Sequence, residues 1–161
     1  MRLMQFAAAV QTLCDGGVDF VVIGGVAGNL HGSAAVTFDL DVCYSRTGAN
    51  LSRLAAALAR FHPRPRGFPT DLPFIWDEAT LRNATVLTLQ TDLGEMDLLA
   101  EVAGLGSFEE VKAHSIEVEA FERKVLALDL PALIRAKRAT GRQKDILALP
   151  ELEGLLEASE N

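Results

Sequence analysis

The strongest constraint on this chain is a pair of aspartates, Asp39 and Asp41, inside an apolar segment. The run from Val21 to Val42, VVIGGVAGNLHGSAAVTFDLDV, joins an apolar strand, a Gly-Gly turn and this D-x-D pair. Side chains at i and i+2 of a strand share one face, and aspartate is depleted in strands. Two aspartates on one face of a strand therefore indicate a functional requirement rather than a packing one.

The spacing of the carboxylates suits a divalent cation. The Cα atoms of the D-x-D pair would lie roughly 6.6 Å apart, with Phe38, Leu40 and Val42 filling the core side of the strand. Asp97, in the apolar segment GEMDLLAEV, would join the pair if its strand lay beside Val36–Tyr44, roughly 4.8 Å away. Oxygen ligands favour Mg²⁺ or Mn²⁺ over zinc. Three carboxylates from two strands predict a two-metal site suited to in-line displacement at phosphorus.

Gly24 and Gly25 lie between the first strand and a short helix. Backbone amides at such a turn can approach a phosphate closely, because no side chain stands in the way. The pair is not a dinucleotide fingerprint, since Val26 stands where a second spaced glycine is needed. It is not a P-loop either, since no Gly-Lys-Ser/Thr follows. The glycines therefore indicate a phosphate site only in combination with the downstream D-x-D.

Length and charge narrow the class of protein. A chain of 161 residues suits one domain over residues 1–161. The net charge of −7 argues against a broad nucleic-acid surface, which needs basic residues. Nearly half of the 15 lysines and arginines gather near the C-terminus, as expected for binding a small anion. These are Arg123, Lys124, Arg135, Lys137, Arg138, Arg142 and Lys144.

The sequence predicts a cytoplasmic protein without a membrane span. Cys14 and Cys43 match no metal or redox spacing and are interpreted as free thiols in a reducing compartment. No apolar run reaches the length of a membrane span. The N-terminal MRLMQFAAAVQTLCDGG is interpreted as a helix rather than an export signal, because Gln5, Gln11 and Asp15 interrupt it.

Periodicity and turn residues predict a mixed α/β chain around one sheet. Helices are expected over Leu3–Leu13, Val26–His31, Ser107–Val111, Asp129–Ala139 and Arg142–Glu157. A further helix would be capped by Asn50 or Ser52 and run to Phe61, and one helical turn is expected at Asp77–Leu81. Strands are expected over Val18–Ile23, Val36–Tyr44, Ala84–Gln90 and Glu95–Leu99, with one or two more over Ile116–Phe121 and Val125–Leu128. Four of the six prolines lie from His62 to Pro73, which predicts a loop without regular structure.

The order strand, Gly-Gly, short helix, D-x-D strand and G-E-M-D-L-L resembles the DNA polymerase β-type nucleotidyltransferase superfamily. The C-terminal LDLPALIRAKRATGRQKDILALPEL, Leu128–Leu152, is similar to small bacterial single-domain nucleotidyltransferases grouped with abortive-infection (AbiEii-type) toxins. The resemblance covers roughly residues 18–155. It implies a nucleotidyltransferase fold, in which helices flank a mixed sheet and a helical pair ends the chain.

The resemblance also implies an activity. The enzyme would move a nucleoside monophosphate from an NTP to a hydroxyl acceptor with Mg²⁺ or Mn²⁺; a small molecule, a protein side chain and an RNA end all stay open as acceptors. A role in a toxin–antitoxin or abortive-infection system is implied as well. The implied metal ligands and catalytic residues are Asp39, Asp41 and Asp97, and Gly24 and Gly25 would lie at the triphosphate.

The C-terminal basic residues complete the implied site. Lys137 would face the nucleotide phosphates, and Asp145 would orient the basic residues around it. Lys144 can converge with them, because this segment spans the end of one helix and the start of the next. One departure is that Ala34 and Ala35 stand where relatives often carry an arginine shortly before the T-x-D-x-D segment.

The D-x-D pair also occurs in other classes of protein. A haloacid-dehalogenase-type phosphatase also begins with D-x-D, but it wants Thr or Val where Cys43 stands, and it does not need the upstream glycines. An EF-hand is excluded because the glycine and glutamate of its loop are missing. A non-catalytic partner or nucleotide-binding protein of the same fold remains the alternative. Tyr44 and Trp76 stay open between base stacking and core packing.

Overall fold

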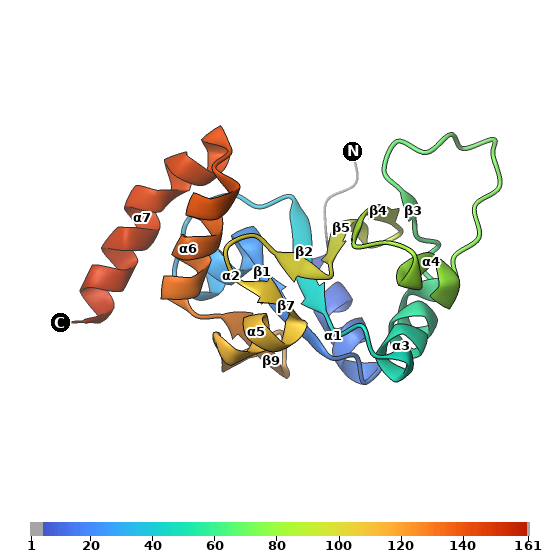
Figure 1. Cartoon of the computed structure of the whole chain (residues 1–161), viewed down its shortest axis with the longest axis horizontal. Helices are drawn as coiled ribbons and strands as arrows, with labels where there is room; N and C mark the ends of the chain where they lie inside the picture. The colour runs from blue at the N-terminus through green and yellow to red at the C-terminus, as the bar shows by residue number, and fades with distance from the viewer. Residues whose placement is uncertain (1–4, 161) are drawn as a thin grey trace.

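The computed structural model describes residues 5–160, and its centre is a seven-stranded mixed sheet in the order β3-β4-β5-β2-β1-β9-β8 (Figure 1). Its strands are β1 (Phe20–Ile23), β2 (Asp39–Tyr44), β3 (Arg64–Pro65), β4 (Val86–Thr91), β5 (Gly94–Leu99), β8 (Ser115–Ala120) and β9 (Arg123–Leu128). The short strands β6 (Glu101–Val102) and β7 (Gly106–Ser107) pair separately, and sequence periodicity did not predict them.

Helices pack around this sheet. They are α1 (Phe6–Asp15), α2 (Gly24–Leu30), α3 (Gly48–Ala59), α4 (Glu78–Arg82), α5 (Phe108–Ala113), α6 (Leu130–Thr140) and α7 (Gln143–Ser159). The last two lie side by side at one end of the molecule, while α3 and α4 lie together at the other (Figure 1). The predicted fold class, a mixed sheet flanked by helices with a C-terminal helical pair, is confirmed.

Strand β2 occupies the middle of the sheet, and its neighbours position the acidic residues. It runs antiparallel to β1 and parallel to β5. In the register with β5, Asp41 lies opposite Asp97 and Asp39 lies opposite Glu95. The condition placed on Asp97, that its strand lie beside the D-x-D strand, is therefore met.

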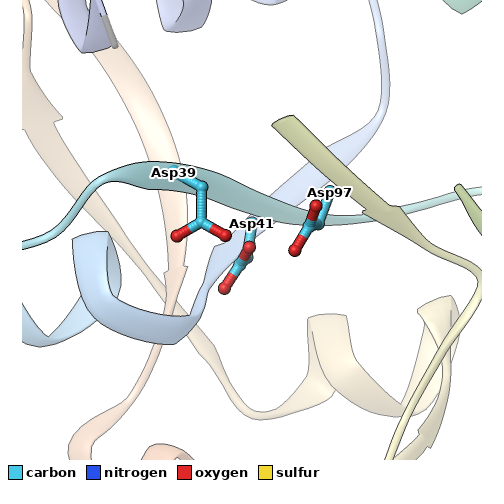
Figure 2. Close-up of side chains that lie close together, drawn as sticks. All are labelled: Asp39, Asp41 and Asp97. Atoms are coloured by element: carbon cyan, nitrogen blue, oxygen red, sulfur yellow. The ribbon is translucent and has the colours of Figure 1, made fainter. Parts of the chain in front are cut away.

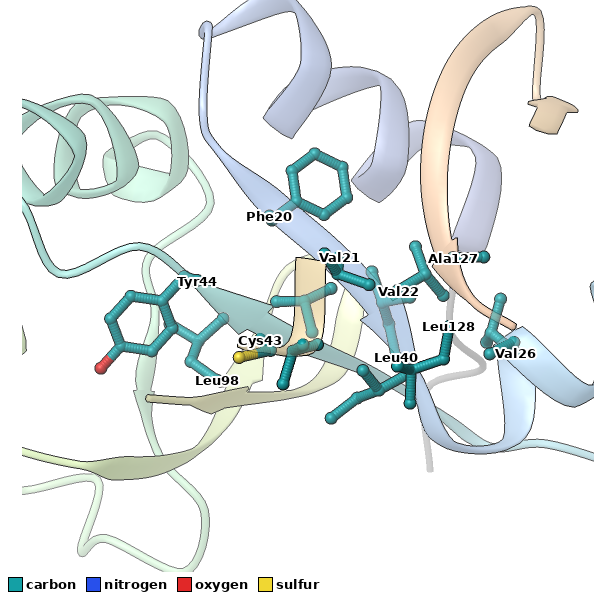
Figure 3. Close-up of a cluster of buried hydrophobic side chains, with 14 of the residues drawn as sticks. Phe20, Val21, Val22, Val26, Leu40, Cys43, Tyr44, Leu98, Ala127 and Leu128 are labelled. Atoms are coloured by element: carbon teal, nitrogen blue, oxygen red, sulfur yellow. The ribbon is translucent and has the colours of Figure 1, made fainter. Parts of the chain in front are cut away.

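The core forms where these strands bury β-branched and leucine side chains (Figure 3). Leu40 and Val42 are fully buried and alternate with the two aspartates along β2, as the D-x-D pattern predicts. Tyr44 is also fully buried, and its hydroxyl lies 3.5 Å from the carbonyl of Ala84. Tyr44 is therefore a core residue with no face open to a nucleobase.

The D-x-D strand is shorter than predicted. It begins at Asp39, not at Val36, and the side chains of Val36 and Phe38 are 77% and 57% exposed. The prediction that Phe38 fills the core side is wrong. The preceding segment turns outward because its backbone groups bond to side chains instead of a neighbouring strand, as when Ala35 O accepts from Asn29 Nδ2 at 2.9 Å.

Two helix starts also differ from the sequence prediction. Helix α2 begins at Gly24 rather than Val26. Thr47, not Asn50 or Ser52, caps α3, and its hydroxyl accepts from the backbone N of Asn50. Asn50 is instead buried, where its amide group joins β1 to the end of β2 through bonds to Asp19 and Ser45. A buried amide with several partners of this kind fixes loops and cannot serve as a cap.

The later helix ends follow the predicted signals. Asp129 caps α6 by accepting from Ala132 N at 2.8 Å, and Gly141 ends it with a left-handed backbone at φ 67°. Ser107 and Glu110 form a reciprocal capping box on α5. The predicted first helix is present as α1, although its expected first residue, Leu3, lies outside the described residues.

The proline-rich segment is not wholly irregular. Arg64 and Pro65 form β3 at the edge of the sheet, where a proline is tolerated because its missing N–H leaves no central ladder bond broken. The prediction that no regular element occurs there is wrong by these two residues. Within residues 5–160, no helix is long and apolar enough to cross a membrane.

Candidate active site

Three carboxylates meet where β2 and β5 lie side by side (Figure 2). Asp39 and Asp41 project from one face of β2, and Asp97 projects from β5 toward them. Each offers one oxygen, and these oxygens all lie within 4.8 Å of one another. The structure therefore brings together the three residues that the sequence predicted as metal ligands.

The glycine pair lies directly against this cluster. Gly24 has a positive φ of 65°, and a Cβ atom on it would lie 2.3 Å from Asp41 Oδ2. A Cβ on Gly25 would lie 2.7 Å from Thr37 Oγ1. Gly24 is therefore needed twice, for its backbone conformation and for the room that the Asp41 carboxylate takes. A phosphate contact by either glycine stays a prediction.

The surroundings of the carboxylate cluster raise the pKa of two of its members. Burial, and then the nearby charges of Asp39 and Asp97, raise the pKa of Asp41 to about 8. Burial and the charge of Asp97 raise the pKa of Asp39 as well. Asp41 Oδ1 is buried and accepts no hydrogen bond from the described residues. Like charges and an unsatisfied oxygen are what a cation would relieve.

Two basic residues flank the carboxylates. The positive charge of Lys144, near the start of α7, acts against the rise in the pKa of both Asp39 and Asp41. Arg66, which follows β3, donates from Nη2 to Asp97 Oδ1 at 2.9 Å. Sequence reasoning included Lys144 but missed Arg66. Nothing local marks Arg66, because its contact joins a proline-rich loop to a strand 31 residues away.

Lys137 lies at the junction of α6 and α7 and contacts Asp145. Its Nζ lies 3.7 Å from Asp145 Oδ1, and Asp145 Oδ2 accepts from Arg142 Nε at 2.8 Å. Asp145 thus holds two basic side chains at the helical junction. A nucleotide contact by Lys137 stays a prediction. Arg138 faces elsewhere and pairs with Glu153.

His31, Trp76 and Cys43 have structural surroundings instead of a place in the carboxylate cluster. His31 Nε2 lies 2.7 Å from the carbonyl of Leu128, at the C-terminus of α2. The Trp76 indole donates to Ala55 O at 2.8 Å. Cys43 is fully buried, and burial raises the pKa of its thiol to about 12, so it is not a nucleophile. Ala34 and Ala35 are exposed on the loop before β2.

The donor set fits a hard divalent cation. All three converging side chains supply carboxylate oxygens, which Mg²⁺ and Mn²⁺ prefer. Asp41 Oδ1 is buried without a hydrogen-bond partner among the described residues, and a cation at the cluster would compensate it. Asp39, Asp41 and Asp97 would hold the cation, which would supply charge neutralisation and activation of an oxygen nucleophile.

Comparison with known proteins supports the fold independently of this geometry. No family model and no curated protein matches the sequence. Among solved structures, the chain is similar to the crystal structure of a "putative nucleotidyltransferase" from Thermotoga maritima, with a TM-score of 0.58 and 14% sequence identity. The match covers 95% of this chain and 96% of that one. At this identity the likeness shows a shared nucleotidyltransferase fold.

Proposed function

We propose that this protein is a metal-dependent nucleotidyltransferase that moves a nucleoside monophosphate from an NTP to a hydroxyl acceptor. The observation that carries the proposal is the carboxylate cluster, in which Asp41 keeps a buried oxygen without a hydrogen-bond partner among the described residues. Burying like charges at such short range costs stability. Binding of a cation and a polyphosphate would relieve this cost, which is the reason for proposing that the site binds them.

Each part of the site has a proposed task. Asp39 and Asp41 would hold the cation, and Asp97 would complete the ligand set from the neighbouring strand. Gly24 and Gly25 would present backbone amides to the triphosphate. Lys144 would add positive charge, because it already acts electrostatically on both β2 carboxylates. Lys137, held by Asp145, is proposed to act on the phosphates from the helical pair.

The proposed reaction is a single displacement at the α-phosphorus of the NTP. A bond forms between the acceptor oxygen and Pα, and the bond from Pα to the bridging oxygen of the β-phosphate breaks. Pyrophosphate leaves with that electron pair, and the hydroxyl proton passes to a carboxylate of the cluster. The chain's own contribution is to fix the reacting groups in line and to surround them with charge.

The test begins with binding and then measures transfer. Wild-type protein is screened against the four NTPs with Mg²⁺ or Mn²⁺ by thermal shift, because a ligand that binds the folded state raises Tm. Transfer is followed with α-labelled NTP and pooled acceptors. Asp41→Asn should lower transfer by more than about 100-fold, since loss of a direct ligand should exceed the 10–100-fold typical of outer-shell partners.

The matched control is Asp71→Asn, which removes one negative charge from an exposed residue of the proline-rich segment. It should leave both the thermal shift and transfer unchanged. Binding of an NTP without transfer to any acceptor would favour the non-catalytic nucleotide-binding alternative. Absence of any thermal shift with all four NTPs at millimolar metal would contradict the proposal outright.

The biological role implied by the resemblance also belongs to the proposal. If the protein is an AbiEii-type toxin, its expression in a bacterial host should arrest growth, and Asp41→Asn should abolish the arrest. Growth that is equal for wild type and variant would remove the toxin role while leaving the enzymatic proposal to the labelling experiment.

A further inference from the structure

Among the described arginines, Arg66 is the one whose side chain contacts the carboxylate cluster of Asp39, Asp41 and Asp97. Its Nη2 donates both to Asp97 Oδ1 at 2.9 Å and to the carbonyl of Leu89 at 3.2 Å. Its Nε lies 3.7 Å from Glu95 Oε2. The guanidinium is thus held between β4 and β5, on the side of Asp97.

The backbone beside Arg66 is fixed as well. Arg66 N donates to the carbonyl of Thr88 at 2.8 Å, which continues the pairing of β3 with β4. The following turn is closed by Arg64, whose Nη2 donates to the carbonyls of Pro69 and Leu72 at 3.0 Å each. Arg66 therefore enters the site from an ordered edge of the sheet.

The contact with Arg66 occupies one of the two carboxylate oxygens of Asp97. One oxygen, Oδ1, accepts from the guanidinium, while the carboxylate as a whole faces Asp39 and Asp41 (Figure 2). A carboxylate held in this way has one oxygen left for a cation. It would ligate through a single oxygen in a fixed direction.

We propose that Arg66 is a positioning residue that holds Asp97 as a single-oxygen ligand and so sets which divalent cation the site prefers. This inference rests on the proposed function, because it needs the carboxylate cluster to bind a cation. Mg²⁺ and Mn²⁺ suit a fixed set of single-oxygen ligands, since Mg²⁺ demands near-ideal octahedral geometry. Ca²⁺ accepts flexible and bidentate carboxylates. An Asp97 released from Arg66 should favour Ca²⁺.

A loss of positive charge at Arg66 would change cation binding in a different way from a loss of Asp97 geometry. Removing a positive charge near the cluster strengthens the binding of any divalent cation, and the Coulomb contribution is the same for two ions of equal charge. The ratio of the Ca²⁺ Kd to the Mn²⁺ Kd therefore cancels the charge effect and reports the geometry of Asp97. Arg66→Lys separates the effect of charge from that of geometry in a second way, because it keeps the positive charge and loses the planar guanidinium.

The experiment measures both Kd values by calorimetry on nucleotide-free protein. Wild type is compared with Arg66→Lys, Arg66→Gln and Arg66→Ala, and the ratio is measured on each variant that retains a cooperative melt. The ratio should fall by about 10-fold in these variants, the lower end of the range typical of partners that orient a metal ligand. Where transfer is measurable, kcat should fall while KM for the NTP changes little.

Arg64→Ala is the matched control, because it loosens the same segment without touching Asp97. It should keep the wild-type ratio. An unchanged ratio in the Arg66 variants, or an equal fall in Arg64→Ala, would overturn the positioning role while leaving the proposed function intact. A wild-type protein that binds neither cation would overturn both.

Discussion

Asp145 is a buried carboxylate and Asp41 is a half-buried one, and their surroundings are opposite. Asp145 is 3% exposed and contacts two basic side chains, Lys137 at 3.7 Å and Arg142 at 2.8 Å. Asp41 has acidic neighbours instead, and its Oδ1 accepts no hydrogen bond from the described residues. Asp145 has direct contacts with basic side chains, whereas Asp41 has only the more distant charge of Lys144.

The difference separates the structural role of Asp145 from the ligand-binding role proposed for Asp41. A buried charge is tolerated when partners replace the water it has lost. Asp145 has such partners and fixes the junction of α6 and α7. Asp41 lacks them, so the folded state carries a cost that a cation can remove. The partners of a buried acid, rather than its burial, therefore indicate which task it performs.

The largest stability effect expected from this comparison is at Gly24. Gly24→Ala should destabilise the protein by about 2–4 kcal/mol, because a side chain at positive φ costs about 1–2 kcal/mol and the new methyl group overlaps Asp41. Urea unfolding measures the change. In an Asp41→Ala background the carboxylate is gone and only the 3.1 Å approach to the Cβ of residue 41 remains, so Gly24→Ala should cost little more than the unfavourable backbone conformation.

Gly48→Ala is the matched glycine control. Gly48 begins α3 with open space around it, so a methyl group there should change stability by less than about 0.5 kcal/mol. If Gly24→Ala costs as much with Asp41 removed as with it present, the close packing of Gly24 on the carboxylate is not what requires a glycine.

The second prediction tests the compensated carboxylate. Asp145→Asn should lower the free energy of unfolding by about 1.5–3 kcal/mol, the range of hydrogen bonds to charged groups, since Lys137 and Arg142 lose their anionic partner. The control is Glu153→Gln in the same helix, whose partner Arg138 is exposed; it should cost less than about 1 kcal/mol. Equal costs for the two variants would break the distinction drawn between Asp145 and a surface acid.

The third prediction concerns pH, and its effect is the smallest only when it is counted per pH unit; it tests Asp41, the carboxylate without basic contacts. Burial and the two acidic neighbours raise the pKa of Asp41 from 3.8 to about 8. Between these values the folded state keeps a proton that the unfolded chain has lost, so metal-free stability should fall as pH rises toward 8 and level off above it. Asp41→Asn cannot titrate and should gain on wild type by up to about 1.4 kcal/mol per pH unit.

Urea melts of both proteins from pH 5 to pH 9 in the presence of a chelator measure this difference. Because a cation competes with the same proton, Mn²⁺ binding to wild type should strengthen from pH 6 to pH 8. A stability difference between wild type and Asp41→Asn that does not change with pH would mean that Asp41 is ionised throughout and is compensated after all.

Sequence reasoning located the carboxylates because each one violates a local pattern. Asp39, Asp41 and Asp97 interrupt strands that are otherwise apolar, and a violation of periodicity is visible without knowledge of the partner strand. Helix ends at Asp129 and Gly141 were predictable for a related reason, since capping depends on residues within one turn. The order of the family-like motifs then gave the fold class.

The features that were missed depend on contacts between distant segments. Arg66 reaches Asp97 from a loop, and no spacing rule connects the two residues. Asn50 resembles a helix cap in sequence but bonds to Asp19, which only the fold brings near. Phe38 was assigned to the core by extending the strand alternation, although the loop before β2 leaves the sheet first.

The parallel pairing of β2 with β5 has a consequence for the order of events during synthesis. Two strands that run parallel cannot be joined by a tight turn, and here residues 45–93, with α3, β3, α4 and β4, make the crossover between them. A ribosome that has released only the D-x-D strand has therefore produced two of the three ligands. Closing such a long crossover is a late, non-local step. If the proposed cation binds, it can stabilise only chains that have completed this step, so it would act as a check on finished folding rather than as a template for starting it.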